Sequence, residues 1–288
     1  MGGVASCWGD LRGVGFAQRW VDAGGVATRV LEAGDPGDPA LVFIHGTGGH
    51  AEAYTRNLGP HAAHFHTYSI DMVGHGFSDK PEGSYGFLDY VEHLRAFLDA
   101  EGIERVSISG ESMGAGIGAW FALTYPERVD RLCLNTGAAL YLAPEVIERF
   151  SRLSLDAVRN ATRESVRTRL EFLVHDPSQV TDDLVETRLA IYGQPEFAKI
   201  MPAILSRHTD PETQRTNVIT EEQWRTLRAP TLVLWTTHDP TAPVAAGEQV
   251  AGWIPDSRFV VMEDCGHWPQ FEDAATFNRV HLDFLLGR

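Results

Sequence analysis

Strand-length apolar runs alternate with helix-length segments through the first half of the chain. The runs ALVFIHG (residues 40–46) and RVSISG (105–110) are short, contain β-branched residues and end in glycine. Such runs are typical of strands buried on both faces of a parallel sheet. FLDYVEHLRAFLDAEGI (87–103) and AGIGAWFALTYPERV (115–129) have the length and apolar content of helices packed on a sheet. The alternation over residues 41–137 therefore predicts a parallel sheet with right-handed crossovers.

The pattern changes after Ala138. Residues 141–228 contain no convincing strand and consist of helical patterns. Thr181, followed by two aspartates, has the character of a helix N-cap, and Thr220 with Gln223 fits a capping box. We therefore expect a helical block, inserted as a lid, between two parts of the α/β frame.

Strand patterns return at the end of the chain and also precede the first parallel strands. TLVLWTTHD (231–239) and RFVVMEDCGH (258–267) are strand-like, and a final amphipathic helix follows them. Near the start, two β-type runs are joined by a turn at Gly24-Gly25. The predicted division is a core of residues 1–140 and 229–288 with a helical lid of residues 141–228.

The composition and net charge argue against some classes of binding partner. The 288 residues carry a net charge of −15, which repels nucleic acid and anionic lipid at long range. No apolar run reaches the roughly 18 residues of a membrane span, and the N-terminus lacks the pattern of a secretory signal. Three widely spaced cysteines fit reduced thiols better than a disulfide framework. We expect a cytoplasmic protein that binds neither nucleic acid nor membrane; a small anionic ligand stays compatible, because a local arginine can dominate inside a pocket.

The motif GESMG (residues 110–114) lies where a predicted strand meets a predicted helix. Glycines on both sides allow a turn too tight for side chains, and the turn presents Ser112 at the edge of the sheet. The same turn directs the N–H of Met113 toward a reacting carbonyl, next to the helix N-terminus. This context favours Ser112 as a nucleophile over a serine in an ordinary Gly-rich turn.

A serine nucleophile needs a base, and the base needs an orienting carboxylate. Asp239 and His267 follow Ser112 in the order acid, then histidine, each at the end of a predicted strand. The alternatives are a turn-forming Asp-Pro and a satisfied surface histidine. The loop His45-Gly46-Thr47 follows the first parallel strand, so the N–H of Gly46 or Thr47 is the candidate second oxyanion donor.

The spacing His61-x-x-His64-x-His66 could suggest a metal site. Metal binding would need further ligands that converge on the same point. We interpret the three as loop and strand-edge histidines, and we predict no metal.

These motifs resemble those of the α/β-hydrolase family over nearly the full length of the chain. Within it, CGHWPQFEDAATFNRVHLDFL (residues 265–285) is similar to the C-terminal signature of the meta-cleavage product hydrolases. The resemblance implies a serine-dependent hydrolase that cleaves a C–C bond in a 2-hydroxy-6-oxo-dienoate from bacterial degradation of aromatic compounds. It implies no cofactor, a small-molecule substrate and a homodimer, with Arg188 and Trp268 at the substrate. A carboxylesterase or lactonase with the same triad is the alternative.

Glu111 departs from this resemblance. Many of these hydrolases have asparagine before the nucleophile, and Ala53 takes the place of another substrate-binding asparagine. Glu111 is therefore the third candidate at the substrate. A carboxylate beside a developing oxyanion is unfavourable unless it is paired or points away. We expect Glu111 to form a salt link behind the turn, away from the substrate.

Overall fold

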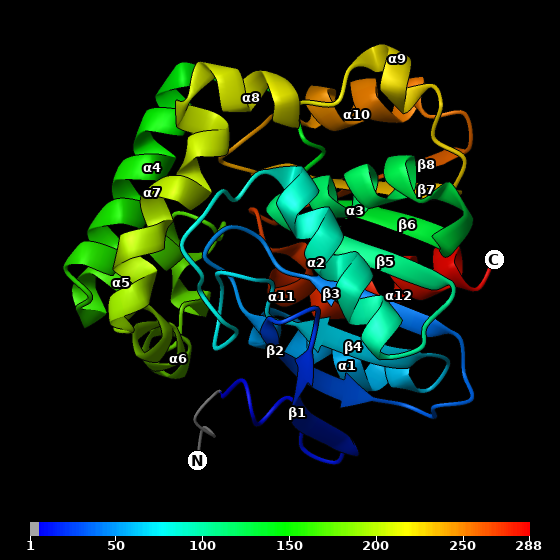
Figure 1. Ribbon diagram of the computed structural model, residues 1–288, viewed down its shortest axis with the longest axis horizontal. Helices are drawn as coiled ribbons and strands as arrows, with labels where there is room; N and C mark the ends of the chain where they lie inside the picture. The colour runs from blue at the N-terminus through cyan, green and yellow to red at the C-terminus, as the bar shows by residue number, and fades with distance from the viewer. Residues whose placement is uncertain (1–5) are drawn as a thin grey trace.

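The computed structural model describes residues 6–288, and an eight-stranded sheet runs through it (Figure 1). In chain order the strands are β1 (Phe16–Asp22), β2 (Ala27–Ala33), β3 (Ala40–Ile44), β4 (His66–Ile70), β5 (Val106–Glu111), β6 (Val129–Asn135), β7 (Thr231–Thr236) and β8 (Ser257–Met262). Their order in the sheet is β1-β2-β4-β3-β5-β6-β7-β8. Strand β2 pairs antiparallel with both its neighbours, and all later pairings are parallel. The predicted hairpin and the predicted parallel sheet are both confirmed.

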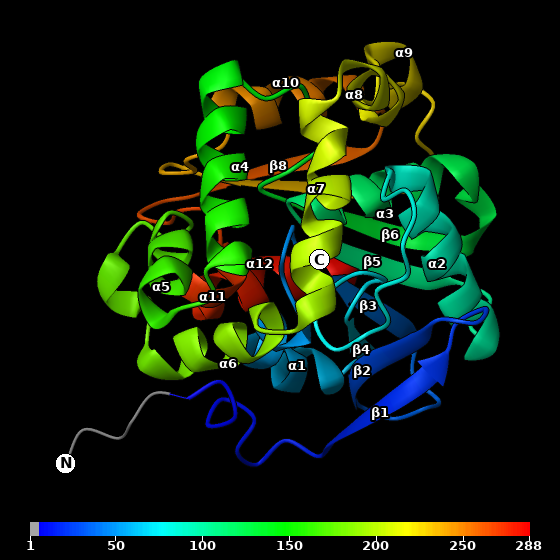
Figure 2. The same ribbon diagram turned by 60° about the vertical axis from the view of Figure 1, so that its left-hand side comes forward.

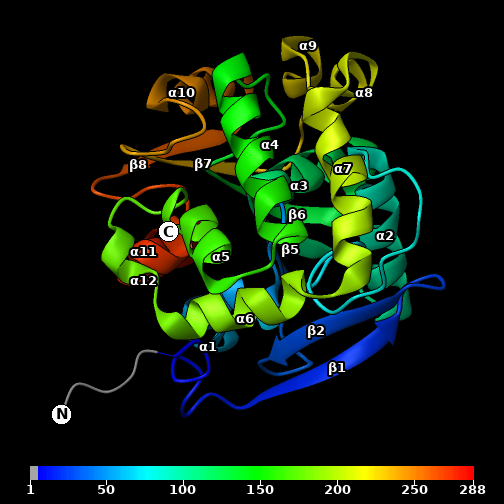
Figure 3. The same ribbon diagram turned by 90° about the vertical axis from the view of Figure 1, so that its left-hand side faces the viewer.

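Helices cover both faces of the sheet, because alternate residues of each strand point to opposite sides. On β3, Leu41 and Phe43 pack in one apolar cluster, whereas Val42 and Ile44 pack in the other. The covering helices outside the 141–228 segment are η1 (Ala51–Tyr54), α1 (Thr55–Ala62), α2 (Phe87–Ala100), α3 (Met113–Thr124), η2 (Pro126–Arg128), α10 (Val244–Trp253), α11 (Pro269–Glu272) and α12 (Ala274–Leu285). Helices α2 and α3 lie on one face, and α1 and α12 lie on the other (Figures 1 and 3).

Six α-helices and one 3-10 turn fill the chain between β6 and β7, and we call residues 144–224 the insertion. They are α4 (Pro144–Arg159), α5 (Arg163–Glu171), η3 (Pro177–Gln179), α6 (Asp182–Tyr192), α7 (Pro195–Thr209), α8 (Pro211–Asn217) and α9 (Glu221–Trp224). The predicted caps are confirmed: the Thr181 hydroxyl accepts from the N–H of Leu184, and Thr220 forms a capping box with Gln223. Figures 2 and 3 show α4 to α7 gathered beside one end of the sheet.

Asn217, at the end of α8, joins the insertion to the core helices. Its Oδ1 accepts from the N–H of Phe87 at 2.6 Å, and its carbonyl accepts from the Trp120 indole at 2.9 Å. Phe87 begins α2, whose first N–H groups have no partner inside the helix, so this contact also caps α2. The insertion is thus held to the same two helices that cover one face of the sheet.

The predicted core includes residues 1–5, which lie outside the described residues. Helices α1 and α10 were not expected from the sequence. No helix in residues 6–288 combines the length and hydropathy that crossing a bilayer requires.

Candidate active site

Ser112 sits at the sharp junction of β5 and α3 with a positive φ of 55° and a ψ of −112°. Such a backbone is strained for a residue with a side chain. The flanking glycines make room for it, because a Cβ on Gly110 would lie 2.1 Å from the carbonyl of Gly114. A Cβ on Gly114 would in turn lie 2.1 Å from the carbonyl oxygen of Ile44. The turn predicted for GESMG is therefore present, and it leaves Ser112 partly exposed.

Asp239 and His267 follow β7 and β8, and their side chains meet. The Asp239 Oδ1 lies 2.9 Å from His267 Nδ1, and it also accepts from the N–H and hydroxyl of Thr241. Burial lowers the pKa of His267, but the carboxylates of Asp239 and Glu111 raise it, and the net shift is upward. The predicted acid and base are thus brought together by two neighbouring strand ends.

Glu111 lies beside this histidine rather than behind the turn. Its Oε1 is 3.3 Å from His267 Nε2, and its Oε2 accepts from the N–H of Gly46 at 2.7 Å. Burial raises the pKa of the Glu111 carboxyl, opposed by the charge of His267 and by the Gly46 hydrogen bond. The expected pairing is present, but the expectation that Glu111 points away from the site is wrong: it lines the same cavity as Ser112.

The imidazole of His267 therefore stands between two carboxylates. Within residues 6–288, the Ser112 hydroxyl has no hydrogen-bond partner, while His267 Nε2 faces Glu111. Both side chains line one small cavity, together with Trp268 and Arg169. Ser112 and His267 thus lie within one site. The Glu111 carboxylate competes with the Ser112 hydroxyl for Nε2 of His267, the nitrogen that would accept the serine proton.

The three candidate oxyanion donors, Gly46, Thr47 and Met113, differ in whether their N–H groups already have a hydrogen-bond acceptor. The Gly46 N–H is occupied by Glu111, which removes it as a free donor. The N–H of Met113 begins α3, where no intrahelical acceptor exists. Within residues 6–288 the N–H of Thr47 also has no acceptor, and Thr47 and Met113 both line a cavity with Ser112. The geometry favours Met113 and Thr47 over Gly46.

Two cavities meet at Ser112. The large cavity is lined by Met113, Trp235, Phe150 and apolar side chains of residues 138–142. The small cavity lies toward His267 and Trp268. Ser112, Thr47 and Phe150 line both cavities. A ligand whose reacting atom lies at Ser112 can therefore extend in two directions.

Arg188, a candidate from sequence, lies inside the protein at 1% exposure. Its Nη1 donates to the carbonyl of Gly48 and, at 3.0 Å, to the Tyr192 hydroxyl. Its guanidinium lies 5.3 Å from the ring of Trp268, a second candidate, which is itself buried. Arg188 is therefore not part of a solvated helix face.

Sequence reasoning missed two further buried arginines, Arg169 of α5 and Arg207 of α7. Arg169 lines the small cavity and Arg207 lines the large one. A signal was available, because Arg207 follows Ile200 and Ile204 at helical spacing on an apolar face. An arginine in such a stripe is either paired or aimed at a ligand.

Two of the three histidines considered for a metal, His61 and His66, have other partners. His61 contacts the carbonyl of Asn57 and the ring of His281, whereas His66 contacts Glu32. His61 and His66 thus contact different groups, whereas the ligands of one metal ion would converge on a common position.

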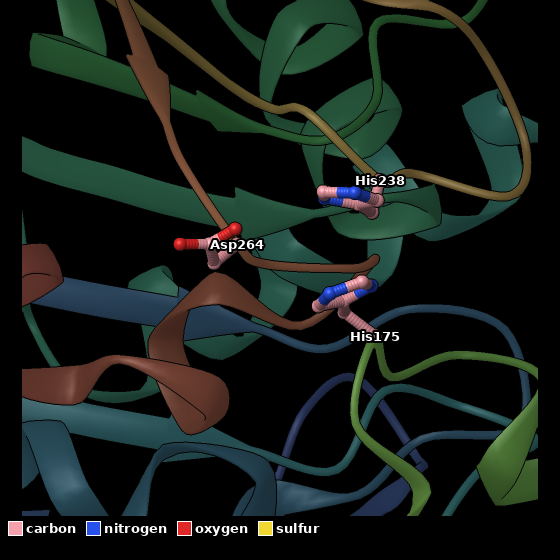
Figure 4. Close-up of side chains that lie close together, drawn as sticks. All are labelled: His175, His238 and Asp264. Carbon is pink, nitrogen blue, oxygen red and sulfur yellow. The ribbon is translucent and has the colours of Figure 1, made fainter.

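A different cluster comes together outside the site: His175, His238 and Asp264, all exposed, with one potential ligand atom each within 4.8 Å of the others. Figure 4 shows the two imidazoles one over the other, with Asp264 beside them. A closed structural zinc site takes four ligands, one more than these three side chains supply. We therefore assign no metal to the cluster.

Comparisons with known proteins identify the family of the chain. The family model described as "alpha/beta hydrolase fold" matches residues 39–274. The 2-hydroxy-6-oxo-2,4-heptadienoate hydrolase of Pseudomonas putida is 32% identical over 279 residues, which are 93% of this chain and 96% of the relative. A 2-hydroxy-6-oxononadienedioate/2-hydroxy-6-oxononatrienedioate hydrolase of Paraburkholderia phymatum is 34% identical over 86% of this chain and 88% of its own.

A solved structure extends the comparison to three dimensions. A variant of the meta-cleavage product hydrolase of Pseudomonas fluorescens IP01 superposes with a TM-score of 0.80 and 29% identity, covering 95% of this chain and 98% of that one. The sheet order, the strained serine turn and these matches lead to one conclusion. The chain belongs to the α/β hydrolase fold family, and its relatives there include enzymes named as hydrolases of 2-hydroxy-6-oxo-dienoates.

Proposed function

We propose that this protein is a serine-dependent hydrolase that cleaves a C–C bond in a 2-hydroxy-6-oxo-dienoate, a ring-fission product of aromatic degradation. The observation that carries the proposal is the buried Arg188, which has no carboxylate partner among residues 6–288 and lies against Trp268 beside the Ser112–His267 site. An ester substrate does not require such a cation, whereas a dienoate carboxylate does. The named activities of the relatives support the same substrate class.

In the proposed mechanism the substrate is first ketonised, so that the fragment to be released can accept an electron pair. Ser112, or a water molecule activated through His267, then adds to the distal carbonyl. The proton released goes to Nε2 of His267, and Asp239, 2.9 Å from Nδ1, stabilises the imidazolium. His267 must exchange its contact with Glu111 for the nucleophile before this step.

The oxyanion that forms is stabilised by the N–H groups of Met113 and Thr47. The bond between C5 and C6 then breaks, and its electron pair stays on C5, which takes a proton. Water supplies the hydroxyl that ends on the acyl carbon. The products are a 2-hydroxypentadienoate and a carboxylic acid, so the reaction balances with water as the one co-reactant.

The proposal includes the insertion as a lid over residues Ser112 and His267. Support comes from the cavity walls, since Phe150 of α4, Arg169 of α5 and Arg207 of α7 line them. We also propose a cytoplasmic location, which fits the three free, buried cysteines, and a homodimer, which rests on the family resemblance.

Two assays run side by side test the function. The purified enzyme is given a 2-hydroxy-6-oxo-dienoate, whose yellow dienolate colour disappears on cleavage, and a p-nitrophenyl ester. We expect cleavage of the dienoate with kcat/KM far above that for the ester. Turnover of esters alone would instead support the carboxylesterase or lactonase alternative.

A further inference from the structure

The loop that carries the Thr47 N–H is a tight turn. The N–H of Gly49 donates to the carbonyl of Gly46 at 2.9 Å, so Thr47 and Gly48 are the two central residues of the turn. Gly48 has a φ of 70°, in the region that glycine favours. The Gly46 carbonyl and the Thr47 N–H belong to one planar trans peptide and point to opposite sides of it. Because the carbonyl points into the turn, the N–H points out of it, and Thr47 lines both cavities that meet at Ser112.

Side chains of the insertion hold both central residues of this turn. Arg207 of α7 donates through Nη2 to the Thr47 hydroxyl. The Gly48 carbonyl accepts from the Tyr192 hydroxyl at 3.2 Å and from Nη1 of Arg188, both on α6. The Tyr192 hydroxyl packs so closely that a Cβ on Gly48 would lie 2.6 Å from its oxygen. The turn is therefore attached to the insertion at two successive residues.

The residue of the turn that has a free N–H is also the one whose side chain Arg207 holds. Among residues 6–288 the Thr47 hydroxyl has no hydrogen-bond partner other than Arg207, and the Thr47 N–H has no acceptor. Gly46 is instead held by groups of the core, through its N–H to Glu111 at 2.7 Å and through its carbonyl to Gly49. The direction of the free donor thus depends on a side chain of α7.

Arg207 is itself fixed in a way that suits this role. It is 1% exposed, its Nη1 donates to the carbonyl of Ile204 at 2.7 Å, and its guanidinium lies 5.8 Å from the ring of Phe87 at the start of α2. The donors of a guanidinium lie in one rigid plane, so holding Nη1 on Ile204 also restricts the direction of Nη2. Arg207 therefore links α7, the start of α2 and the turn that contains Thr47.

We propose that Arg207 is a positioning residue, which by holding the Thr47 hydroxyl keeps the Thr47 N–H directed at the oxyanion that forms beside Ser112. The inference rests on the proposed function, which makes Ser112 the nucleophile and Thr47 an oxyanion donor. Because Arg207 acts through Thr47, it stabilises the transition state, where the oxyanion is present, more than it stabilises bound substrate. The insertion then contributes to bond cleavage as well as lining the cavities.

The first test separates kcat from KM for a 2-hydroxy-6-oxo-dienoate. Arg207→Met should lower kcat by about 10- to 100-fold and leave KM within about threefold, as expected for a misdirected oxyanion donor. Thr47→Val removes the hydroxyl that Arg207 holds and should have the same effect. Arg207→Lys should restore part of kcat, because an ammonium group can also donate to the hydroxyl. Arg215→Met, at an exposed arginine of α8, is the matched control and should be unchanged.

The double variant Arg207→Met/Thr47→Val shows whether the two residues act through one contact. If they do, its kcat should be no lower than that of either single variant, because the second substitution has no further contact to remove. Losses in kcat that multiply in the double variant, or a raised KM with kcat kept in Arg207→Met, would overturn the inference, since Arg207 would then act on the substrate directly. Thr47→Val removes no buried charge, so it decides the question if Arg207→Met does not fold.

A tetrahedral adduct gives a readout without turnover. With phenylboronic acid, the Ser112 Oγ forms a bond to boron, its proton passes to His267, and a boron-bound oxygen takes the place of the oxyanion. Benzoate has the same ring but stays planar and forms no bond to Ser112. In calorimetric titrations Arg207→Met should weaken the binding of phenylboronic acid by about 10-fold or more and that of benzoate by less than about threefold.

Ser112→Ala separates failure of this inference from failure of the proposed function. If Ser112→Ala binds phenylboronic acid as tightly as the unaltered enzyme does, Ser112 is not the nucleophile, and the proposed function and the inference both fail. If Ser112→Ala loses that binding but Arg207→Met and Thr47→Val keep it, Ser112 remains the nucleophile and the inference alone is overturned. If only p-nitrophenyl esters are hydrolysed, the C–C cleavage fails, and the same comparison of kcat on the ester decides the inference, because an oxyanion forms there too.

Discussion

In the proposed mechanism Ser112 is the nucleophile, held by a strained backbone at the end of β5. Ser112→Ala should lower kcat by about 10,000-fold or more, because the rest of the site retains only binding and oxyanion stabilisation. Turnover is measured as the loss of dienolate absorbance, with the same mass of each protein in the assay. Ser84→Ala, at an exposed serine, serves as the control and should be unchanged. Near-normal turnover in Ser112→Ala would remove Ser112 from the nucleophile role.

Glu111 should influence the pH dependence of activity through His267. Its carboxylate lies 3.3 Å from His267 Nε2 and helps to hold the pKa of His267 above its usual value, against burial. Glu111→Gln removes this stabilisation of the imidazolium, so the pKa of His267 falls and its neutral form persists to lower pH. The acidic limb of the kcat/KM profile should therefore move to lower pH.

The control for that profile is Glu127→Gln, at an exposed glutamate, which should not move the limb. An acidic limb that stays in place or moves upward in Glu111→Gln would show that the Glu111 carboxylate does not stabilise the protonated His267.

Among single residues, the sequence predicted Ser112, Asp239 and His267 as a triad because each follows a recognisable strand, and the structure brings Asp239 and His267 into contact. It placed Glu111 on the wrong side of the turn. The side-chain direction of a residue at a strand end depends on the loop opposite, here the Gly46 N–H, which no local pattern encodes. Arg169 was missed for a related reason: whether a buried arginine lines a cavity depends on how separate helices meet.

The helices and strands were easier to predict from the sequence than the directions of the side chains. The parallel strands were visible because burial on both faces leaves uninterrupted apolar runs, as in β3 and β7. The helices of the insertion were visible through caps such as Thr181. Helix α10 was not, since its sequence VAAGEQVAGW, with two internal glycines, has little helical signal and is stabilised by packing, as Gly247 against Trp235 shows.

The turn between β5 and α3 depends on the absence of a Cβ at Gly110. Gly110→Ala would place its methyl group 2.1 Å from the carbonyl of Gly114. The carbonyl carbon and oxygen are backbone atoms, so they cannot rotate away as a side chain can. We expect the free energy of unfolding to fall by about 3 kcal/mol or more. Denaturant titration would measure the change.

Gly83→Ala is the matched control for this substitution, because a Cβ there meets nothing within 4 Å. Its effect should stay within about 0.5 kcal/mol. Equal stabilities for the two variants would mean that β5 and α3 can separate without cost, contrary to the packing described.

For the whole molecule, the buried neutral histidines should set the acid limit of stability. Burial lowers the pKa of His45, His61 and His93 to about 4. Below pH 6.5 the unfolded chain binds protons at these residues and the folded chain does not, so stability falls as pH falls from about 6.5 toward 4. Each contributes a loss on the order of 1–2 kcal/mol by pH 5, partly offset by His267, whose pKa is raised.

Thermal unfolding followed from pH 8 to pH 5 checks this expectation. Tm should be nearly constant above pH 7 and should then drop steeply, with the largest change between pH 6.5 and pH 5. A Tm that is flat across this range would show that these histidines are protonated in the folded protein without cost.

The insertion supplies Arg169, Arg188 and Arg207, whereas the sheet supplies Ser112, Asp239 and His267. In the proposed mechanism, substrate recognition and the reacting groups are therefore encoded in separate stretches of the gene. Substitutions in the insertion would then change which substrate binds while Ser112, Asp239 and His267 stay the same. Glu111 is the exception, a residue of the sheet whose carboxylate lies 3.3 Å from His267 Nε2 and lines the cavity that the proposed substrate enters.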